Sequence, residues 1–226
     1  MLALAGFLTP IVWRRSIGVK IETRPAGPLQ ANFYLVYEDG AGIVIDPGGD
    51  PELIMEIAGD AGVDINAIFI THGHADHLAA APELAAATGA PICASAEAGE
   101  VLVSPEIYSL FPGMPKVTPA KVDRILSDGD SAGFAGLTVA VVATPGHSPG
   151  SLTYFTGGAL FPGDLLFHGS VGRTDLPGGS FEQLAASVKK LVSMFPPDTM
   201  VYPGHGNATT LKQEKENNIF LADLDW

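Results

Sequence analysis

The sequence predicts a layered α/β domain in which two β-sheets face each other and helices cover their outer sides. Two observations favour this class. Strand-like and helix-like segments alternate through the first half of the chain, and a similar succession returns in the second half. Hydrophobic residues make up 46% of the 226 residues and charged residues only 16%, so a sizeable core can form. We expect residues 1–226 to form a single domain.

A strand hairpin and a helix open the first half. Residues 32–37 and 42–45 are rich in aromatic and β-branched residues, and residues 38–40 between them have the composition of a turn. Residues 51–61 follow as a helix, with Asp50 as its N-cap and a proline at the first helical position. The apolar residues of this helix fall on one face, which predicts packing against the hairpin.

A βαβ unit completes the first half. Residues 67–70 form a short apolar strand, residues 78–87 an alanine-rich helix and residues 91–94 the next strand. Cys93 lies in that last strand, and we expect it to be a packed thiol rather than a nucleophile. It is the only cysteine, so no internal disulfide can form, and a reducing cytoplasm fits this composition.

The second half repeats the strand pattern. We expect strands at residues 137–143, 151–156 and 159–161, a helix at residues 181–194 and a strand at residues 200–201. No charged residue occurs between Asp130 and Asp164, but prolines and glycines interrupt this stretch, so buried strands explain it better than a membrane span.

Two segments have no regular pattern. Residues 103–120 contain four prolines, which predicts either a packed surface loop or a mobile apolar flap that reaches substrate through Tyr108 and Phe111. Residues 1–12 are apolar, but a positive pair follows them instead of preceding them, so we do not expect a signal peptide.

The charge balance narrows the range of partners. The chain has 12 Lys and Arg against 25 Asp and Glu, a formal net charge of -13. Such a surface repels phosphate backbones, so we expect neither nucleic acid nor a membrane as a partner. A small-molecule substrate remains, and the sequence does not define the oligomeric state.

The strongest chemical signal is THGHADH at residues 71–77, directly after an apolar strand. Three imidazoles and a carboxylate within seven residues are hard to bury unless a cation binds them. His72 and His74 can face one side of an extended loop, while Asp76 and His77 face another. The spacing therefore predicts two neighbouring metal positions.

Further candidate ligands follow later strands. His147 lies in TPGHS, Asp164 in FPGD and His205 in YPGHG, each after a predicted strand and beside glycine or proline. His168 is the one remaining histidine, and we expect it to lie on the surface or to support the site without binding metal.

The motif at residues 71–77, followed in order by His147, Asp164 and His205, resembles the metallo-β-lactamase superfamily from about residue 32 to residue 205. The resemblance implies a four-layer αββα sandwich with a binuclear metal site. It implies that a first ion binds His72, His74 and His147, that a second binds Asp76, His77 and His205, and that Asp164 bridges them. Asp46, in IDPGG, corresponds to an aspartate that orients the ligand loop without binding the metal.

Within the superfamily, FPGDLLF at residues 161–167 and GRTD at residues 172–175 resemble glyoxalase II, the hydroxyacylglutathione hydrolases, and especially their short bacterial forms. That resemblance implies hydrolysis of S-lactoylglutathione or a related acyl thioester by metal-activated hydroxide, with Asp76 and Asp164 as catalytic ligands. The ions would be zinc, or else iron or manganese. Arg173 either binds a substrate carboxylate or forms an ion pair with Asp175.

Other activities share parts of this pattern. The histidine motif and the GRTD segment also resemble those of persulfide dioxygenases. That resemblance implies a single iron bound by His72, His147 and Asp164. A lactonase and a non-catalytic metal-binding protein are further alternatives. A true β-lactamase is less favoured, because Asp164 stands where the major zinc β-lactamases use a cysteine ligand.

Overall fold

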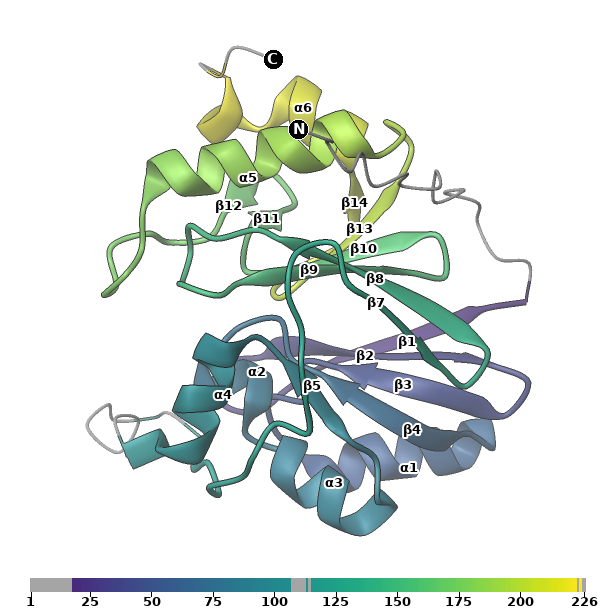
Figure 1. Cartoon of the computed structure of the whole chain (residues 1–226). Coiled ribbons are helices and arrows are strands. Elements are labelled where there is room, and N and C mark those ends of the chain that lie inside the picture. Colours follow the sequence, from purple (N-terminus) through teal and green to yellow (C-terminus); the bar gives the residue numbers. More distant parts are fainter. Residues whose placement is uncertain (1–17, 107–112, 114, 223, 225–226) are drawn as a thin grey trace, which may run out of the picture.

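The computed structural model describes residues 18–106, 113, 115–222 and 224. Two six-stranded sheets pack face to face, and helices cover the outer side of each one (Figure 1). This is the αββα arrangement that the repeated strand pattern predicts. The predictions for residues 1–12 and for a flap through Tyr108 and Phe111 lie outside the described residues.

The N-terminal sheet follows the order of the chain. Its first three strands are antiparallel and the later ones are parallel. They are β1 Lys20–Ala26, β2 Ala31–Glu38, β3 Ala41–Ile45, β4 Asp64–Phe69, β5 Ile92–Ala94 and β6 Arg124–Ile125. The helices of this half are α1 Pro51–Ala61, α2 Ala75–Leu78, α3 Ala81–Thr88 and α4 Ala96–Val103.

The C-terminal sheet has the order β14-β13-β10-β9-β8-β7. Its strands are β7 Ser131–Phe134, β8 Leu137–Ala143, β9 Leu152–Thr156, β10 Ala159–Gly163, β13 Met200–Pro203 and β14 Thr209–Thr210. The outer side carries α5 Phe181–Met194, α6 Leu211–Asn217 and the 3-10 helix η2 Ile219–Leu221, beside a hairpin of β11 Leu166–Phe167 and β12 Ser170–Val171.

Aromatic and branched side chains fill the space between the sheets. Phe69 and Tyr154 meet edge to face with ring centroids 5.1 Å apart, as do Tyr34 and Phe161 at 5.1 Å. Cys93 is fully buried in the same core, which confirms the packed thiol. Burial raises the pKa of this thiol to about 11, so it is not a reactive nucleophile.

Three local details differ from the predictions. The expected helix at residues 78–87 begins later, as α3 at Ala81, because Pro82 lacks the N–H that would continue the short helix α2, which ends at Leu78. Asp50 is the N-cap residue of α1, as predicted, but its carboxylate accepts from the backbone N–H of Gly27 at 2.9 Å and does not cap the helix. Helix α4, whose N-terminus is capped by Ser95, was not predicted.

The uncharged stretch before Asp164 forms strands β7 to β10 of the sandwich. Within the described chain, no helix combines the length and apolarity needed to cross a membrane.

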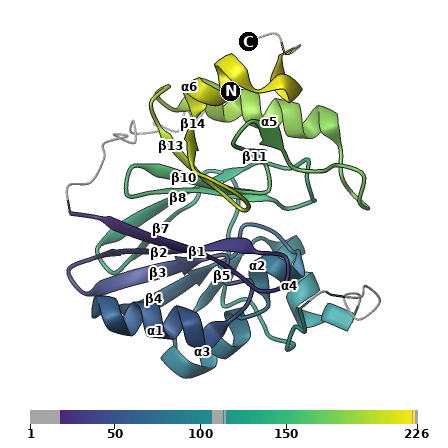
Figure 2. The same ribbon diagram turned by 180° about the vertical axis from the view of Figure 1, so that it is seen from behind.

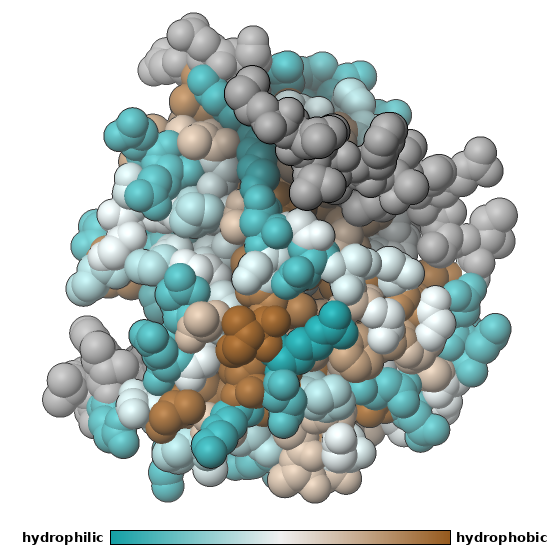
Figure 3. Space-filling model, in the orientation of Figure 1, coloured by the Kyte–Doolittle hydropathy of each residue, from teal (hydrophilic) through white to brown (hydrophobic). Residues whose placement is uncertain are grey.

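The face shown in Figure 3 is mostly polar, with one apolar area near its middle. Val103 and Ile125 are among the exposed large apolar side chains of the protein.

Candidate metal centre

The predicted ligands lie at one edge of the two sheets, in loops that follow strands. The loop and helix after β4 supply four of the seven, and strands of the C-terminal sheet are followed by the other three. The structure brings together His72, His74, Asp76, His77, His147, Asp164 and His205.

The first ligand group is His72, His74 and His147. Nδ1 of His74 lies 3.1 Å from Nε2 of His72 and 2.8 Å from Nε2 of His147, so three ring nitrogens converge. Burial, and then the neighbouring imidazoles, lowers the pKa of His72 well below its usual range and that of His74 to about 4. These two rings are therefore neutral and present lone pairs, as metal binding requires.

Hydrogen bonds behind the first group fix the ring orientation. Nδ1 of His147 donates to the carbonyl oxygen of Arg173 at 2.7 Å. Nδ1 of His72 donates to Oγ1 of Thr71 at 3.0 Å, and that hydroxyl donates to Asp46 at 2.7 Å. With Nδ1 protonated in this way, Nε2 of each ring keeps its lone pair for a cation.

The second ligand group is Asp76, His77 and His205. Oδ2 of Asp76 lies 3.3 Å from Nε2 of His205 and 3.6 Å from Nε2 of His77. Nδ1 of His77 donates to Asp46 at 3.0 Å. Burial alone would lower both histidine pKa values, but carboxylates, including Asp164, raise the pKa of His77 well above its usual range and also raise that of His205. This group favours positive charge.

Asp164 lies between the two groups. Its Oδ1 is 3.3 Å from Nε2 of His77, and its Oδ2 is 3.6 Å from Nε2 of His147 and 3.5 Å from Nε2 of His205. Burial would raise the pKa of Asp164, but the surrounding imidazoles, His77 first, hold it well below its usual range. The carboxylate is therefore ionised and faces both groups.

Two orphaned atoms indicate that the centre is built for cations. Among the described residues, Nε2 of His77 and Oδ1 of Asp164 are buried and have no hydrogen-bond partner. A buried polar atom without a partner is costly, and a cation between these atoms would remove that cost. The nitrogen and carboxylate donors suit zinc, iron or manganese.

Glycines let the ligand loops approach one another. A Cβ on Gly204 would collide with Oδ1 of Asp164 and with the ring of His77. Gly163 has φ +53, and a Cβ there would meet the hydroxyl of Thr71. The glycines beside Asp164 and His205 in the sequence are thus required by close approach and by a left-handed backbone.

Arg173 and His168 lie outside the ligand groups. The guanidinium of Arg173 makes two 2.7 Å hydrogen bonds to the carboxylate of Asp175, and both side chains are exposed. His168 is exposed and accepts from the Gln213 amide at 2.6 Å. Of the two roles considered for the Arg173 side chain, the structure shows the ion pair with Asp175. The backbone carbonyl of Arg173 accepts a hydrogen bond from His147.

Two residues beside the centre, Asn32 and Tyr34, were not predicted; they contact the backbone around His205. They lie in β2, remote in sequence from every ligand motif. The one available signal was an asparagine at the start of an otherwise apolar strand.

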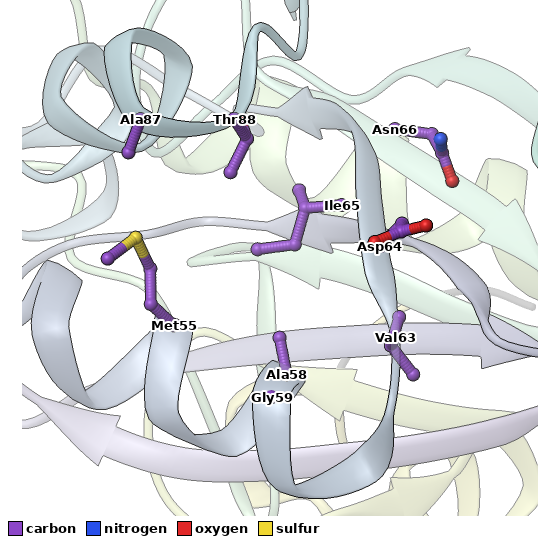
Figure 4. A pocket seen from close by; sticks show the side chains of 9 residues that line it. All are labelled: Met55, Ala58, Gly59, Val63, Asp64, Ile65, Asn66, Ala87 and Thr88. Atoms are coloured by element: carbon purple, nitrogen blue, oxygen red, sulfur yellow. The ribbon is translucent and has the colours of Figure 1, made fainter.

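A hollow at the other end of β4 is distinct from the metal centre. It lies between α1 and α3 and is lined by Asp64, Ile65 and Asn66 among others (Figure 4). These residues begin β4, whereas the ligand loop follows its last residue. The lining contains no histidine, so this hollow does not extend the ligand set.

Proteins of known sequence are similar to this chain over most of its length. The model of the Metallo-beta-lactamase superfamily matches residues 26–205. The hydroxyacylglutathione hydrolase GloC of Haemophilus influenzae is 32% identical over 209 residues, which cover 90% of this chain and 98% of that protein. The probable metallo-hydrolase YqgX of Bacillus subtilis is 32% identical over 213 residues, 92% of this chain and 97% of the relative.

Solved structures agree with the sequence relatives. The BLEG-1 B3 metallo-beta-lactamase superposes with a TM-score of 0.85 at 35% identity, and the di-iron-bound form of TTHA1623 with 0.78 at 39%; each match covers 90% of this chain and 100% of the other. ETHE1 from Myxococcus xanthus has a TM-score of 0.72 at 26% identity, over 90% and 84% of the two chains. The predicted αββα fold is confirmed, and the chain belongs to the metallo-beta-lactamase superfamily of metal-dependent hydrolases.

Proposed function

We propose that this protein is a thioester hydrolase of the glyoxalase II type, acting on S-lactoylglutathione or a related acyl thioester. The observation that carries the proposal is Asp164, an ionised carboxylate that lies between two complete ligand groups. The similarity to GloC over nearly the whole of both chains supports the substrate class.

In this proposal His72, His74 and His147 hold one divalent ion, Asp76, His77 and His205 hold a second, and Asp164 serves both. Bound ions of this kind lower the pKa of water to roughly 7, so hydroxide is available at neutral pH, and they polarise a substrate carbonyl. Zinc is our first choice. Iron is an alternative, as TTHA1623 is di-iron-bound, and manganese is another.

The chain's own residues hold the ligands in place for the reaction. Asp46 accepts from Thr71 and His77, so one carboxylate orients rings of both groups. Asp76 and Asp164 are ionised and offset part of the positive charge that two divalent ions bring. A thioester suits such a site, since a thiol with a pKa of about 8.5 leaves readily as its anion.

A second candidate is a single-iron persulfide dioxygenase. The GRTD segment at residues 172–175 favours it, and Oδ2 of Asp164 lies 3.6 Å from Nε2 of His147, close enough for both to serve one ion. This function leaves Asp76 and His205 without a role, although their donor atoms face each other at 3.3 Å. We therefore rank it below the hydrolase.

Metal counting combined with substrate assays tests the proposal. We expect about two ions per chain and turnover of S-lactoylglutathione with release of glutathione. One iron per chain, with oxygen uptake on glutathione persulfide and no thioester turnover, would establish the dioxygenase instead. A β-lactam and a lactone complete the panel, and inactivity of the metal-loaded protein on all substrates, phosphodiesters included, would indicate a non-catalytic metal-binding protein.

A further inference from the structure

A strand of the N-terminal sheet holds the loop that carries His205. The backbone N–H of Asn32, in β2, donates to the carbonyl oxygen of Gly204 at 2.7 Å. The side-chain amide of Asn32 donates to the carbonyl oxygens of Pro203 at 3.0 Å and Gly206 at 2.9 Å. Both hydrogens of one NH2 group are thus bound to carbonyls on either side of His205, where the loop after β13 reaches toward the N-terminal sheet (Figure 2).

Tyr34 adds a further donor from the same strand. Its hydroxyl donates to the carbonyl oxygen of Pro203 at 2.5 Å. The ring is 3% exposed, and burial raises the pKa of this phenol, so the hydroxyl keeps its proton. Asn32 is 8% exposed, and its amide is therefore shielded from competing water.

His205 differs from most of the other ligand histidines in how its ring is held. His147 donates from Nδ1 to the carbonyl of Arg173, and His77 donates from Nδ1 to Asp46. Among the described residues we find no hydrogen bond to Nδ1 of His205. Its side chain is 31% exposed, against 4% for His147. Apart from an edge-to-face contact with Phe167, the position of its ring therefore depends on the backbone of its loop.

We propose that Asn32 is a positioning residue for the second ligand group: it fixes the His205 loop and so strengthens binding of the second ion. The inference rests on the proposed binuclear function. Asn32 makes no hydrogen bond to the first group, in which the rings of His72 and His147 are held through Thr71 and Arg173. Loss of the amide should therefore weaken one ion and spare the other.

Without the Asn32 side chain, the His205 loop is still hydrogen-bonded to the C-terminal sheet. The N–H of Gly204 donates to the carbonyl oxygen of Gly163 at 2.9 Å, and β13 pairs with β10 and β14. Removal of the side-chain amide should therefore loosen the loop rather than unfold the sandwich. The isosteric change Asn32→Asp is the sharpest test, because it replaces two donors by an oxygen that faces two carbonyls.

The experiment titrates metal-free protein with zinc in the presence of a competing chelator and resolves two stepwise dissociation constants. We expect Asn32→Asp to weaken the second constant at least about tenfold, as is typical when the partner of a ligand is removed, and to leave the first within about twofold. Tyr34→Phe keeps the ring and removes one donor, so about threefold on the second constant is expected. Ile54→Ala, in the buried face of α1, controls for general loss of stability and should change neither constant.

The outcomes separate the two proposals. Two unchanged constants in both β2 variants, with two ions in the wild type, would overturn the role of Asn32 and leave the binuclear centre intact. Equal weakening of both constants would also overturn it, since this would reflect general loosening. A wild type that binds one ion would overturn the binuclear function and this inference together. Should Asn32→Asp fail to fold, Tyr34→Phe decides: selective weakening of the second ion supports the role, and wild-type constants contradict it.

Discussion

The two ligand groups of the metal centre are built from different kinds of side chain. The first consists of three imidazoles, with Nδ1 of His74 3.1 Å from Nε2 of His72 and 2.8 Å from Nε2 of His147. The second combines two imidazoles with a carboxylate, and further carboxylates face its histidines. The histidine pKa values follow this difference: they are lowered in the first group at His72 and His74 and raised in the second at His77 and His205.

A single loop and the helix that follows it supply ligands to both groups, although the two groups differ in charge. His72 and His74 precede α2, while Asp76 and His77 lie on it, so the start of that short helix separates the groups. Neutral rings bind a cation without displacing a proton, whereas rings beside carboxylates bind it in competition with protons. The second ion should therefore depend more on pH and on loop position.

Loss of Asp164 should have the largest effect, because it is the carboxylate that faces both groups. We expect Asp164→Ala to lower kcat with S-lactoylglutathione by about 100-fold or more and to reduce the metal content, while circular dichroism stays native. Asp198→Ala, an exposed aspartate in a turn, is the matched control and should turn over normally. Wild-type activity of Asp164→Ala would remove its bridging role.

Single histidine deletions test whether the two groups bind separate ions. We expect His147→Ala to lose the first ion and about 100-fold in kcat, and His205→Ala to lose the second ion and about 10-fold to 100-fold. Metal content per chain and kcat, measured on the same samples, check both. Undiminished oxygen uptake on glutathione persulfide by His205→Ala with one bound iron, and no thioester turnover, would instead support the dioxygenase.

Acidification should release the ions in order. The raised pKa values of His77 and His205 mean that protons compete for these rings from above the usual histidine range, so binding of the second ion weakens as pH falls through it. The pKa of His74 is lowered to about 4, so this ring of the first group keeps its lone pairs down to about that pH. Zinc titrations at several pH values between about 8 and 5 should show a steeper loss of the second ion than of the first. If both ions were lost over the same pH range, the two groups would not differ in their competition with protons.

Much of the fold could be predicted because the apolar patterns are local. Residues 51–61 and 181–194 form helices with the predicted bounds, and residues 137–143 form the predicted strand. The edge strands β1 and β6 were missed, since most of their residues are at least partly exposed and show little hydrophobic periodicity, and β14 was missed because it is only two residues long. Gly99 within α4 weakened the helical pattern there.

In the candidate site, too, residues in local sequence patterns could be predicted and residues that act over long sequence distances could not. The ligands could be predicted because histidines and aspartates cluster after apolar strands, beside glycines that later prove to be in close contact. Asn32 and Tyr34 could not be predicted, because hydrogen bonds to backbone carbonyls 169 to 174 residues away leave no pattern in a single sequence. Only the packing of the two sheets brings these groups together.

Arg173→Met tests the side chain whose two roles the sequence left open. Since its guanidinium is paired with Asp175, we expect the KM for S-lactoylglutathione to rise by no more than about threefold, with kcat unchanged. Its backbone carbonyl, which holds His147, is unaffected by the change. A KM raised about tenfold or more, with Asp175→Asn as a silent control, would assign Arg173 to a substrate carboxylate instead.

His168→Ala should have the smallest effect, and it sets the baseline for the ligand deletions. The ring is exposed in the turn between β11 and β12, and it forms a hydrogen bond with the Gln213 amide rather than with a ligand. Because neither ligand group loses a donor or an orienting hydrogen bond, kcat and both zinc constants should stay within about twofold of the wild type. A larger loss confined to the second ion would mean that this hairpin supports His205, since Phe167 beside it contacts that ring edge to face at 6.0 Å.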